Sequence, residues 1–142
     1  MTPQQTAEFV RDAMFGNDRA SKALGMRILE VTPGHAVLAM TVREDMVNGH
    51  DICHGGLIAM LADSAFAYAC NSYNEWTVAS GFAIDLLAPS KLGDELTARC
   101  HEVSKTGRAG VYDAEITDQN GKRVAVFRGR SHTVRGKPAV AG

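Results

Sequence analysis

One acidic residue stands in the middle of an apolar stretch of the chain. Asp63 is the only formally charged side chain between Asp51 and Glu75, and its neighbours are mainly alanine, leucine, methionine and phenylalanine. A carboxylate in such surroundings is costly unless it is paired, hydrogen-bonded or protonated, and such groups are candidate catalytic acids, bases or nucleophiles. A position on a narrow solvent-facing stripe, or a purely structural role, accounts for Asp63 equally well.

The apolar stretch begins with His54, Gly55 and Gly56. Free backbone N–H groups at the start of a helix attract negative charge, and glycine lets a ligand approach the backbone closely. Gly55 and Gly56 could therefore polarise a carbonyl and stabilise the oxyanion that forms on attack. The two glycines could equally do no more than make the turn into the helix. At ~1.5 Å per residue, Gly55 and Asp63 lie about 12 Å apart along one helix. Both cannot contact one reacting group, so we expect a two-fold dimer with composite sites.

Other polar residues near this stretch are weaker candidates for a functional role. Ser64 follows Asp63 and could hold a water, or bond back to a carbonyl of its own helix. Asn17 and Asn48 are loop residues whose amides could orient a water or a carbonyl, although loop asparagines are more often turn formers.

Two other kinds of site, a metal site and a nucleophilic thiol, are suggested by His50, Cys53 and His54. A closed zinc site needs four ligands, and no second cluster follows downstream, so we expect no metal. A nucleophilic thiol at Cys53 is also disfavoured, because adjacent residues in a chain rarely face each other.

The pattern of residue types predicts helices first and strands afterwards. Thr2 and Pro3 suit the start of a helix that runs to about Met14, is broken by residues 16–18, and is followed by a short helix over 18–24. Strands are expected at 26–31, 35–43, 76–88, 95–104, 110–117 and 123–135, with a long helix over 55–71 between the second and third strands. Asn120-Gly121 predicts a type I′ hairpin turn, in which both central residues have positive φ.

Consecutive hairpins imply a mostly antiparallel sheet, and the long helix is the only candidate to cover its apolar face. The expected fold class is α+β, with a sheet wrapped on one helix. We expect a single domain over residues 1–142, with an N-terminal helical segment over 1–25 and a flexible tail over 136–142.

Composition excludes several classes of partner. Of the 142 residues, 45% are hydrophobic and 22% are charged, with a net charge of −1, so no basic stripe for nucleic acid is present. No apolar run approaches the ~18–20 residues of a membrane span, and no signal peptide is visible. Three cysteines, an odd number, favour a reducing compartment. We therefore expect a cytoplasmic protein without nucleic-acid or membrane partners.

The central segment is similar to the main motif of the hotdog-fold thioesterases, and within them to the phenylacetate-degradation (PaaI-type) group. The motif runs from Asn48-Gly-His through Cys53-His-Gly-Gly to Leu61-Ala-Asp-Ser-Ala-Phe-Ala-Tyr. Flanking segments at 17–25, 83–94, 110–113 and 124–132 also resemble this group, so the likeness covers residues 15–132.

The resemblance implies a hotdog fold, dimers that commonly pair into tetramers, and hydrolysis of aryl-acyl-CoA thioesters without a metal or cofactor. It makes Asp63 the catalytic carboxylate and the Gly55 N–H the group that polarises the carbonyl. Supporting site residues are Asn17, His54 and Ser64. We expect substrate contacts from Asn48, Gly56, Lys91 and Arg108, of which the last two are candidates for the CoA phosphates and are otherwise solvated loop charges.

Two other functions remain open. A hydratase or dehydratase on the same fold would also use an acid and a histidine, and would consume an enoyl-thioester without releasing thiol. A non-catalytic acyl-CoA-binding module would bind ligand without turnover and would tolerate neutralisation of Asp63.

Overall fold

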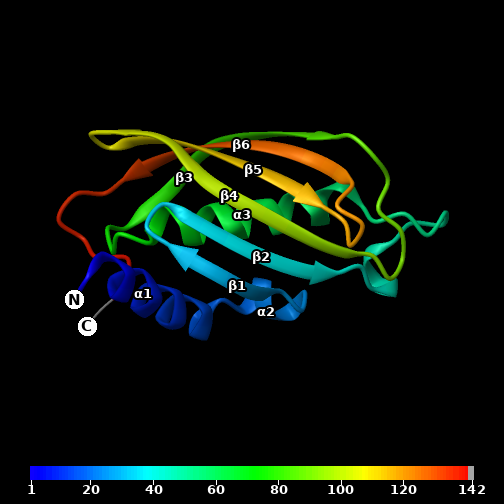
Figure 1. The fold of residues 1–142 in the computed structure, drawn as a ribbon, viewed down its shortest axis with the longest axis horizontal. Coiled ribbons are helices and arrows are strands. Elements are labelled where there is room, and N and C mark those ends of the chain that lie inside the picture. The colour runs from blue at the N-terminus through cyan, green and yellow to red at the C-terminus, as the bar shows by residue number, and fades with distance from the viewer. Residues whose placement is uncertain (141–142) are drawn as a thin grey trace.

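A six-stranded antiparallel sheet curves around the long helix α3 (Gly55–Asn71), as Figure 1 shows for the computed structural model. The structure describes residues 1–140. The strands are β1 (Arg27–Thr32), β2 (His35–Thr41), β3 (Thr77–Leu86), β4 (Glu95–Thr106), β5 (Ala109–Thr117) and β6 (Arg123–Thr133). Their order across the sheet is β1-β2-β4-β5-β6-β3, which leaves β1 and β3 at the edges. The expected α+β hotdog arrangement is confirmed.

Helix α3 occupies the concave side of the sheet because it is apolar on nearly every face. Leu61, Phe66 and Tyr68 of this helix are among the largest fully buried side chains of the described residues. The Phe66 ring lies 5.5 Å from the Tyr112 ring and 5.8 Å from the Phe127 ring, measured between centroids. The bounds of α3 agree with the predicted helix. Within the described residues, no helix is long and apolar enough to cross a membrane.

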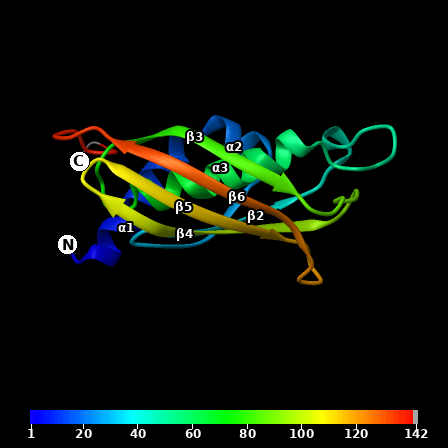
Figure 2. The ribbon, with the colours of Figure 1, turned by 90° about the horizontal axis from the view of Figure 1, so that it is seen from above.

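Two helices precede the sheet and lie on the same side as α3 (Figure 2). Helix α1 (Pro3–Asn17) begins with a capping box between Thr2 and Gln5, and α2 (Arg19–Ala23) is capped by Asp18. A short 3-10 turn, η1 (Glu44–Met46), follows β2.

Helix α1 runs past its predicted end near Met14, through Gly16 to Asn17, so of the predicted break at residues 16–18 only Asp18 separates α1 from α2. A glycine inside a helix costs only ~1 kcal/mol. The packing of Met14 and Phe15 against the core outweighs that cost.

The β5–β6 hairpin is present, but its predicted turn type was wrong. Gly121 has a φ of 78°, whereas Asn120 does not have a positive φ. The Asp118 side chain accepts hydrogen bonds from the backbone N–H groups of Asn120 (2.9 Å) and Lys122 (3.0 Å). This local acceptor favours a longer loop over residues 118–122 in place of the two-residue turn.

Part of the segment expected to be a flexible tail makes hydrogen bonds. The Lys137 carbonyl accepts from the Trp76 N–H (2.9 Å), and the Val140 N–H donates to the Asn74 side chain (3.1 Å). Residues 141–142 of that expected tail lie outside the described residues.

Candidate active site

The loop before α3 is held by its own side chains. The Asn48 amide oxygen accepts hydrogen bonds from the backbone N–H groups of His50 (2.9 Å) and Ile52 (3.2 Å). His54 is the N-cap residue of α3, and its N–H donates to the Met46 carbonyl (2.9 Å). The His54 side chain is exposed and caps no backbone group. Asn48 therefore shapes the loop, while His54 leaves its imidazole free beside the start of the helix.

Gly55, the first residue of α3, borders an apolar cavity. A Cβ atom at position 55 would overlap the side chain of Leu86, whereas one at Gly56 would meet nothing within 4 Å. The cavity has a volume of about 260 Å³. It is lined by Ile52, Cys53, Gly55, Ile58, Leu86, Leu87, Ala88, Pro89 and Ser90. Since the first N–H groups of a helix have no partner within the helix, this cavity has backbone donors on one side and apolar walls on the others.

The two predicted basic residues lie at opposite ends of α3. Lys91 forms an isolated β-bridge with Ile52, which places it near the start of the helix. Arg108 lies in the β4–β5 turn, where its carbonyl accepts from the N–H of Thr133 (2.8 Å). Thr133 pairs with Thr77, which is bonded to Asn71 at the end of α3. Within one chain, only Lys91 is near Gly55.

Asp63 lies two turns into α3 and is partly buried. Burial, and secondarily the negative charge of Asp18, raise the pKa of the Asp63 carboxyl above its ordinary value. No hydrogen bond contributes to this shift among residues 1–140. A carboxyl whose pKa is displaced towards neutrality is better suited to proton transfer than an ordinary surface aspartate.

A small network fixes the α1–α2 junction against α3 beside Asp63. The Tyr68 hydroxyl donates to Asp18 (2.9 Å), which also accepts from the Ser21 N–H (3.1 Å). The hydroxyls of Ser21 and Ser64 lie 3.0 Å apart, and both side chains are buried. The Ser64 hydroxyl is thus bonded to α2, and Asn17 lies exposed at the end of α1 next to Asp18.

Sequence reasoning gave Asp18 no functional role. The available signal was its position as an acid at the break between two helices, where aspartate is a favoured N-cap residue. That signal predicts a cap, but it does not reveal that Asp18 lies near Asp63, since the two come together only when α2 packs on α3.

Apart from Arg108, the predicted site residues form two groups in the chain. One group surrounds the start of α3 and contains Asn48, His54, Gly55, Gly56 and Lys91. The other contains Asn17, Asp63 and Ser64. Gly55 and Asp63 belong to one continuous helix, so about 12 Å separates them along its axis. The single chain does not bring the two groups to one point.

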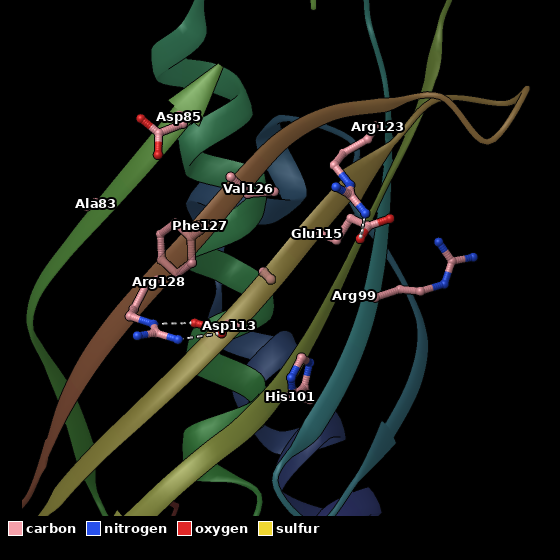
Figure 3. A pocket seen from close by; sticks show the side chains of 11 residues that line it. Ala83, Asp85, Arg99, His101, Asp113, Glu115, Arg123, Val126, Phe127 and Arg128 are labelled. Carbon is pink, nitrogen blue, oxygen red and sulfur yellow. Dashed lines mark hydrogen bonds and ion pairs between the residues drawn. The ribbon is translucent and has the colours of Figure 1, made fainter. Parts of the chain in front are cut away.

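A larger cavity, of about 610 Å³, lies elsewhere, on the sheet face that points away from α3 (Figure 3). It is lined by charged side chains that largely pair with each other. Arg128 bonds Asp113 at 2.6 and 2.8 Å, and Arg123 lies 3.2 Å from Glu115. The Arg128 hydrogen bond lowers the pKa of Asp113, so this acid is a poor base. None of the predicted site residues lines this groove.

The metal and thiol interpretations gain no geometric support. Among residues 1–140, no three His, Cys, Asp or Glu side chains are grouped so that they could hold a metal ion. Cys53 is buried, and burial raises the pKa of its thiol, which keeps the thiol protonated and weakly nucleophilic.

Comparison with known proteins agrees with this fold. The family model of the thioesterase superfamily matches residues 50–125, more than half of the chain. Acyl-coenzyme A thioesterase PaaI of Escherichia coli K12 is 50% identical over 124 residues, which cover 87% of this chain and 89% of the relative.

Two solved structures extend the comparison. The structure of the E. coli PaaI protein from the phenylacetic acid degradation operon has a TM-score of 0.93 at 46% identity, covering 96% of this chain and 99% of that one. A hypothetical thioesterase from Streptococcus pneumoniae TIGR4, solved with coenzyme A, has a TM-score of 0.79 at 25% identity, covering 88% and 96%. The chain therefore belongs to the thioesterase superfamily, and its activity is thioester hydrolysis.

Proposed function

We propose that the protein hydrolyses aryl-acyl-CoA thioesters, such as phenylacetyl-CoA and its ring-hydroxylated forms, in phenylacetate degradation. The observation that carries this proposal is the pairing, on one helix, of a glycine N-terminus that borders an apolar cavity with a partly buried acid of raised pKa. The names of the E. coli relatives support the acyl-CoA substrate and the pathway. The coenzyme A in the S. pneumoniae structure supports the same leaving group.

In the proposed reaction the thioester carbonyl lies against the start of α3. The Gly55 N–H donates to the carbonyl oxygen and stabilises the negative charge that develops on it. Asp63 removes a proton from an attacking water, whose oxygen bonds the carbonyl carbon. The C–S bond then breaks and CoA leaves as the thiolate. Direct attack by Asp63, to give a mixed anhydride that water later hydrolyses, uses the same groups.

The 12 Å between Gly55 and Asp63 leads us to place each active site between two copies of the chain. Strand β3 has one unpaired edge. It carries exposed apolar side chains, as do the residues beside it, namely Trp76, Val78, Phe82, Leu86 and Leu87. An unpaired apolar edge is a surface on which a second copy can continue the sheet. A two-fold axis there would run the two α3 helices antiparallel, so that Asp63 of one copy faces Gly55 of the other.

The remaining predicted residues have supporting roles in this proposal. In this proposal Asp63 is supported by Asn17 and Ser64. The Gly55 N–H is supported by His54 and Asn48. A Cβ atom at Gly56 would meet nothing within 4 Å, which supports room for substrate there. The bridge between Lys91 and Ile52, near the start of α3, supports a contact of Lys91 with a CoA phosphate. Arg108 lies at the far end of its own α3, so it would serve the composite site of a neighbouring copy. Pairing of such dimers into tetramers belongs to the same proposal.

Thiol release tests the proposed function. The wild type and Asp63→Asn are compared on phenylacetyl-CoA, its hydroxylated forms and a straight-chain acyl-CoA. We expect the wild type to prefer the aryl substrates and the folded variant to be nearly inactive. Retained activity in Asp63→Asn would show that the carboxylate is structural.

The competing functions give different results in the same assay. Loss of enoyl-CoA absorbance without free thiol would identify a hydratase. Binding of acyl-CoA without turnover, unchanged by Asp63→Asn, would identify a binding module.

A further inference from the structure

The cavity beside Gly55 contains one polar side chain among apolar ones. Its walls are mainly hydrocarbon, from Ile52, Ile58, Leu86, Leu87 and Pro89. Among residues 1–140, Ser90 is the only hydroxyl residue that lines it. The cavity adjoins the proposed carbonyl-binding N–H, so it is the space into which the acyl group of a bound thioester would extend.

Ser90 is fully buried, with 0% of its surface exposed, and its hydroxyl has no hydrogen-bond partner within residues 1–140. No other buried side-chain nitrogen or oxygen among the described residues lacks one. The hydroxyl of Ser72, for comparison, donates to the Ala69 carbonyl (2.7 Å) and accepts from the Gly34 N–H (2.8 Å). Since a buried unpaired hydroxyl is costly, its presence in a ligand cavity calls for an explanation.

The backbone around Ser90 keeps the hydroxyl in place. The Ser90 carbonyl accepts from the Cys53 N–H (2.8 Å), and the adjacent Lys91 forms a β-bridge with Ile52. The Lys91 N–H also donates to the side chain of Asp94 (2.8 Å). These contacts fix Ser90 to the loop that precedes α3. The hydroxyl can rotate about its side-chain bond, but Ser90 cannot move out to solvent without breaking them.

We propose that Ser90 is a specificity-determining residue, whose hydroxyl hydrogen-bonds a polar substituent on the acyl group. This inference rests on the proposed function. The acyl group of a thioester bound at the Gly55 N–H would extend into this cavity, and Ser90 supplies the hydroxyl of its lining. A serine hydroxyl both donates and accepts, so it matches a ring hydroxyl. A site that hydrogen-bonds a substrate hydroxyl discriminates against the analogue that lacks it, because its own polar group is then left unpaired.

The test compares wild type with Ser90→Ala on phenylacetyl-CoA and on its 3-hydroxy and 4-hydroxy forms. We expect kcat/KM of Ser90→Ala to fall roughly three- to tenfold on a hydroxylated substrate, as for the loss of one neutral hydrogen bond, and to be unchanged on phenylacetyl-CoA. The Tm of Ser90→Ala should equal or exceed that of wild type, because the hydroxyl has no partner to lose.

Ser72→Ala is the matched control, since it removes a buried hydroxyl that has two partners and lies at the other end of α3. It should lower the Tm and leave the substrate ratio unchanged. If Ser90→Ala instead lowers the Tm as Ser72→Ala does, or reduces kcat/KM equally on all substrates, the hydroxyl is structural and the inference is overturned.

Binding of non-hydrolysable thioether analogues separates this inference from the proposed function. Isothermal titration calorimetry with the phenylacetyl and hydroxyphenylacetyl analogues measures their affinity for the protein in the absence of turnover. Absence of thiol release from wild type would contradict the proposed function, while a preference for the hydroxylated analogue that Ser90→Ala abolishes would still support the inference. Equal analogue affinities in wild type and Ser90→Ala would overturn the inference and leave thioester hydrolysis standing.

Discussion

Asp63 is held in surroundings that favour its neutral form. Its pKa in the folded protein is raised above the ordinary value of 3.8 by burial and by Asp18. The stabilisation from the protonated carboxyl is therefore fully present below the unfolded pKa and is lost as the pH rises through the folded pKa. Ionised Asp63 thus lowers the stability of the fold at neutral pH, which is a common cost of a functional acid.

Asp63→Asn should consequently raise the Tm at neutral pH. The amide is uncharged at every pH, so the gain over wild type should shrink as acid protonates the wild-type carboxyl. Thermal unfolding of both proteins in buffers from neutral to acidic pH measures the difference. A variant that is less stable than wild type at neutral pH would show that the carboxylate has a stabilising partner.

Asp18→Asn should move the acid limb of the kcat/KM profile to lower pH. Asparagine keeps an acceptor oxygen for the Ser21 N–H, and its NH2 group can donate to the Tyr68 hydroxyl oxygen in place of the bond that Asp18 accepts. It removes the negative charge that raises the pKa of Asp63. Because either catalytic role of Asp63 needs the ionised form, a lower pKa extends activity towards acid. Asp12→Asn, on the exposed face of α1, is the control and should leave the limb in place. An unshifted limb in Asp18→Asn would contradict the coupling of the two acids.

Gly55 and Gly56 offer a matched pair of substitutions at the start of α3. Gly55→Ala places a methyl group against Leu86, whereas Gly56→Ala meets open space. Displacing the oxyanion donor should lower kcat/KM about a hundredfold for Gly55→Ala, since a shift of ~1 Å at a reacting group costs that much. Steady-state kinetics on one thioester checks the pair. Equal effects of the two substitutions would argue against a specific role for the Gly55 N–H.

At the level of secondary-structure elements, the contact between α2 and α3 positions the acids near the candidate active site. The two serine hydroxyls that join them are buried and lie 3.0 Å apart. A short helix such as α2 has little stability of its own, so its position depends on such tertiary contacts. Through this contact α2 also holds the Asp18 carboxylate near Asp63.

Ser21→Ala and Ser64→Ala should each destabilise the protein by about 1–3 kcal/mol, because each leaves the other hydroxyl buried without a partner. The double variant should lose less than the sum of the two, since it removes both hydroxyls. Denaturant unfolding of all four proteins in the cycle measures the coupling. Strictly additive losses would show that the two hydroxyls do not interact.

At the level of the whole molecule, the free edge of β3 decides whether the two groups of site residues can meet. A lysine on an edge strand opposes pairing with another strand. Val78→Lys, on β3, should therefore give a monomer in light scattering, with kcat/KM reduced at least about a hundredfold and the circular dichroism spectrum unchanged. Val103→Lys is the control, because Val103 is exposed to a similar extent, 50% against 38%, but lies on the interior strand β4. A fully active Val78→Lys monomer would overturn the composite site.

The sequence by itself determined the elements and their class. The bounds of α3 follow from an apolar segment between a glycine pair and the residues that lead into β3, and the hairpins follow from alternating residues and turn signals. The chemistry of Asp63 and Gly55 also follows from residue types and spacing, since eight residues of helix fix their separation. The end of α1 was predicted too early, and the type of the β5–β6 turn was wrong, because core packing and the Asp118 side chain outweighed local propensity.

Tertiary structure alone decided which distant residues meet. Asp18 lies near Asp63, and Ser90 lines the cavity next to Gly55, although the residues around each position in the sequence do not indicate these contacts. Proximity of this kind arises when separate elements pack on one helix, and a one-dimensional pattern records periodicity within an element but not contacts between elements. The unpaired edge of β3 is likewise a property of the strand order, which is set only when the whole sheet has formed around α3.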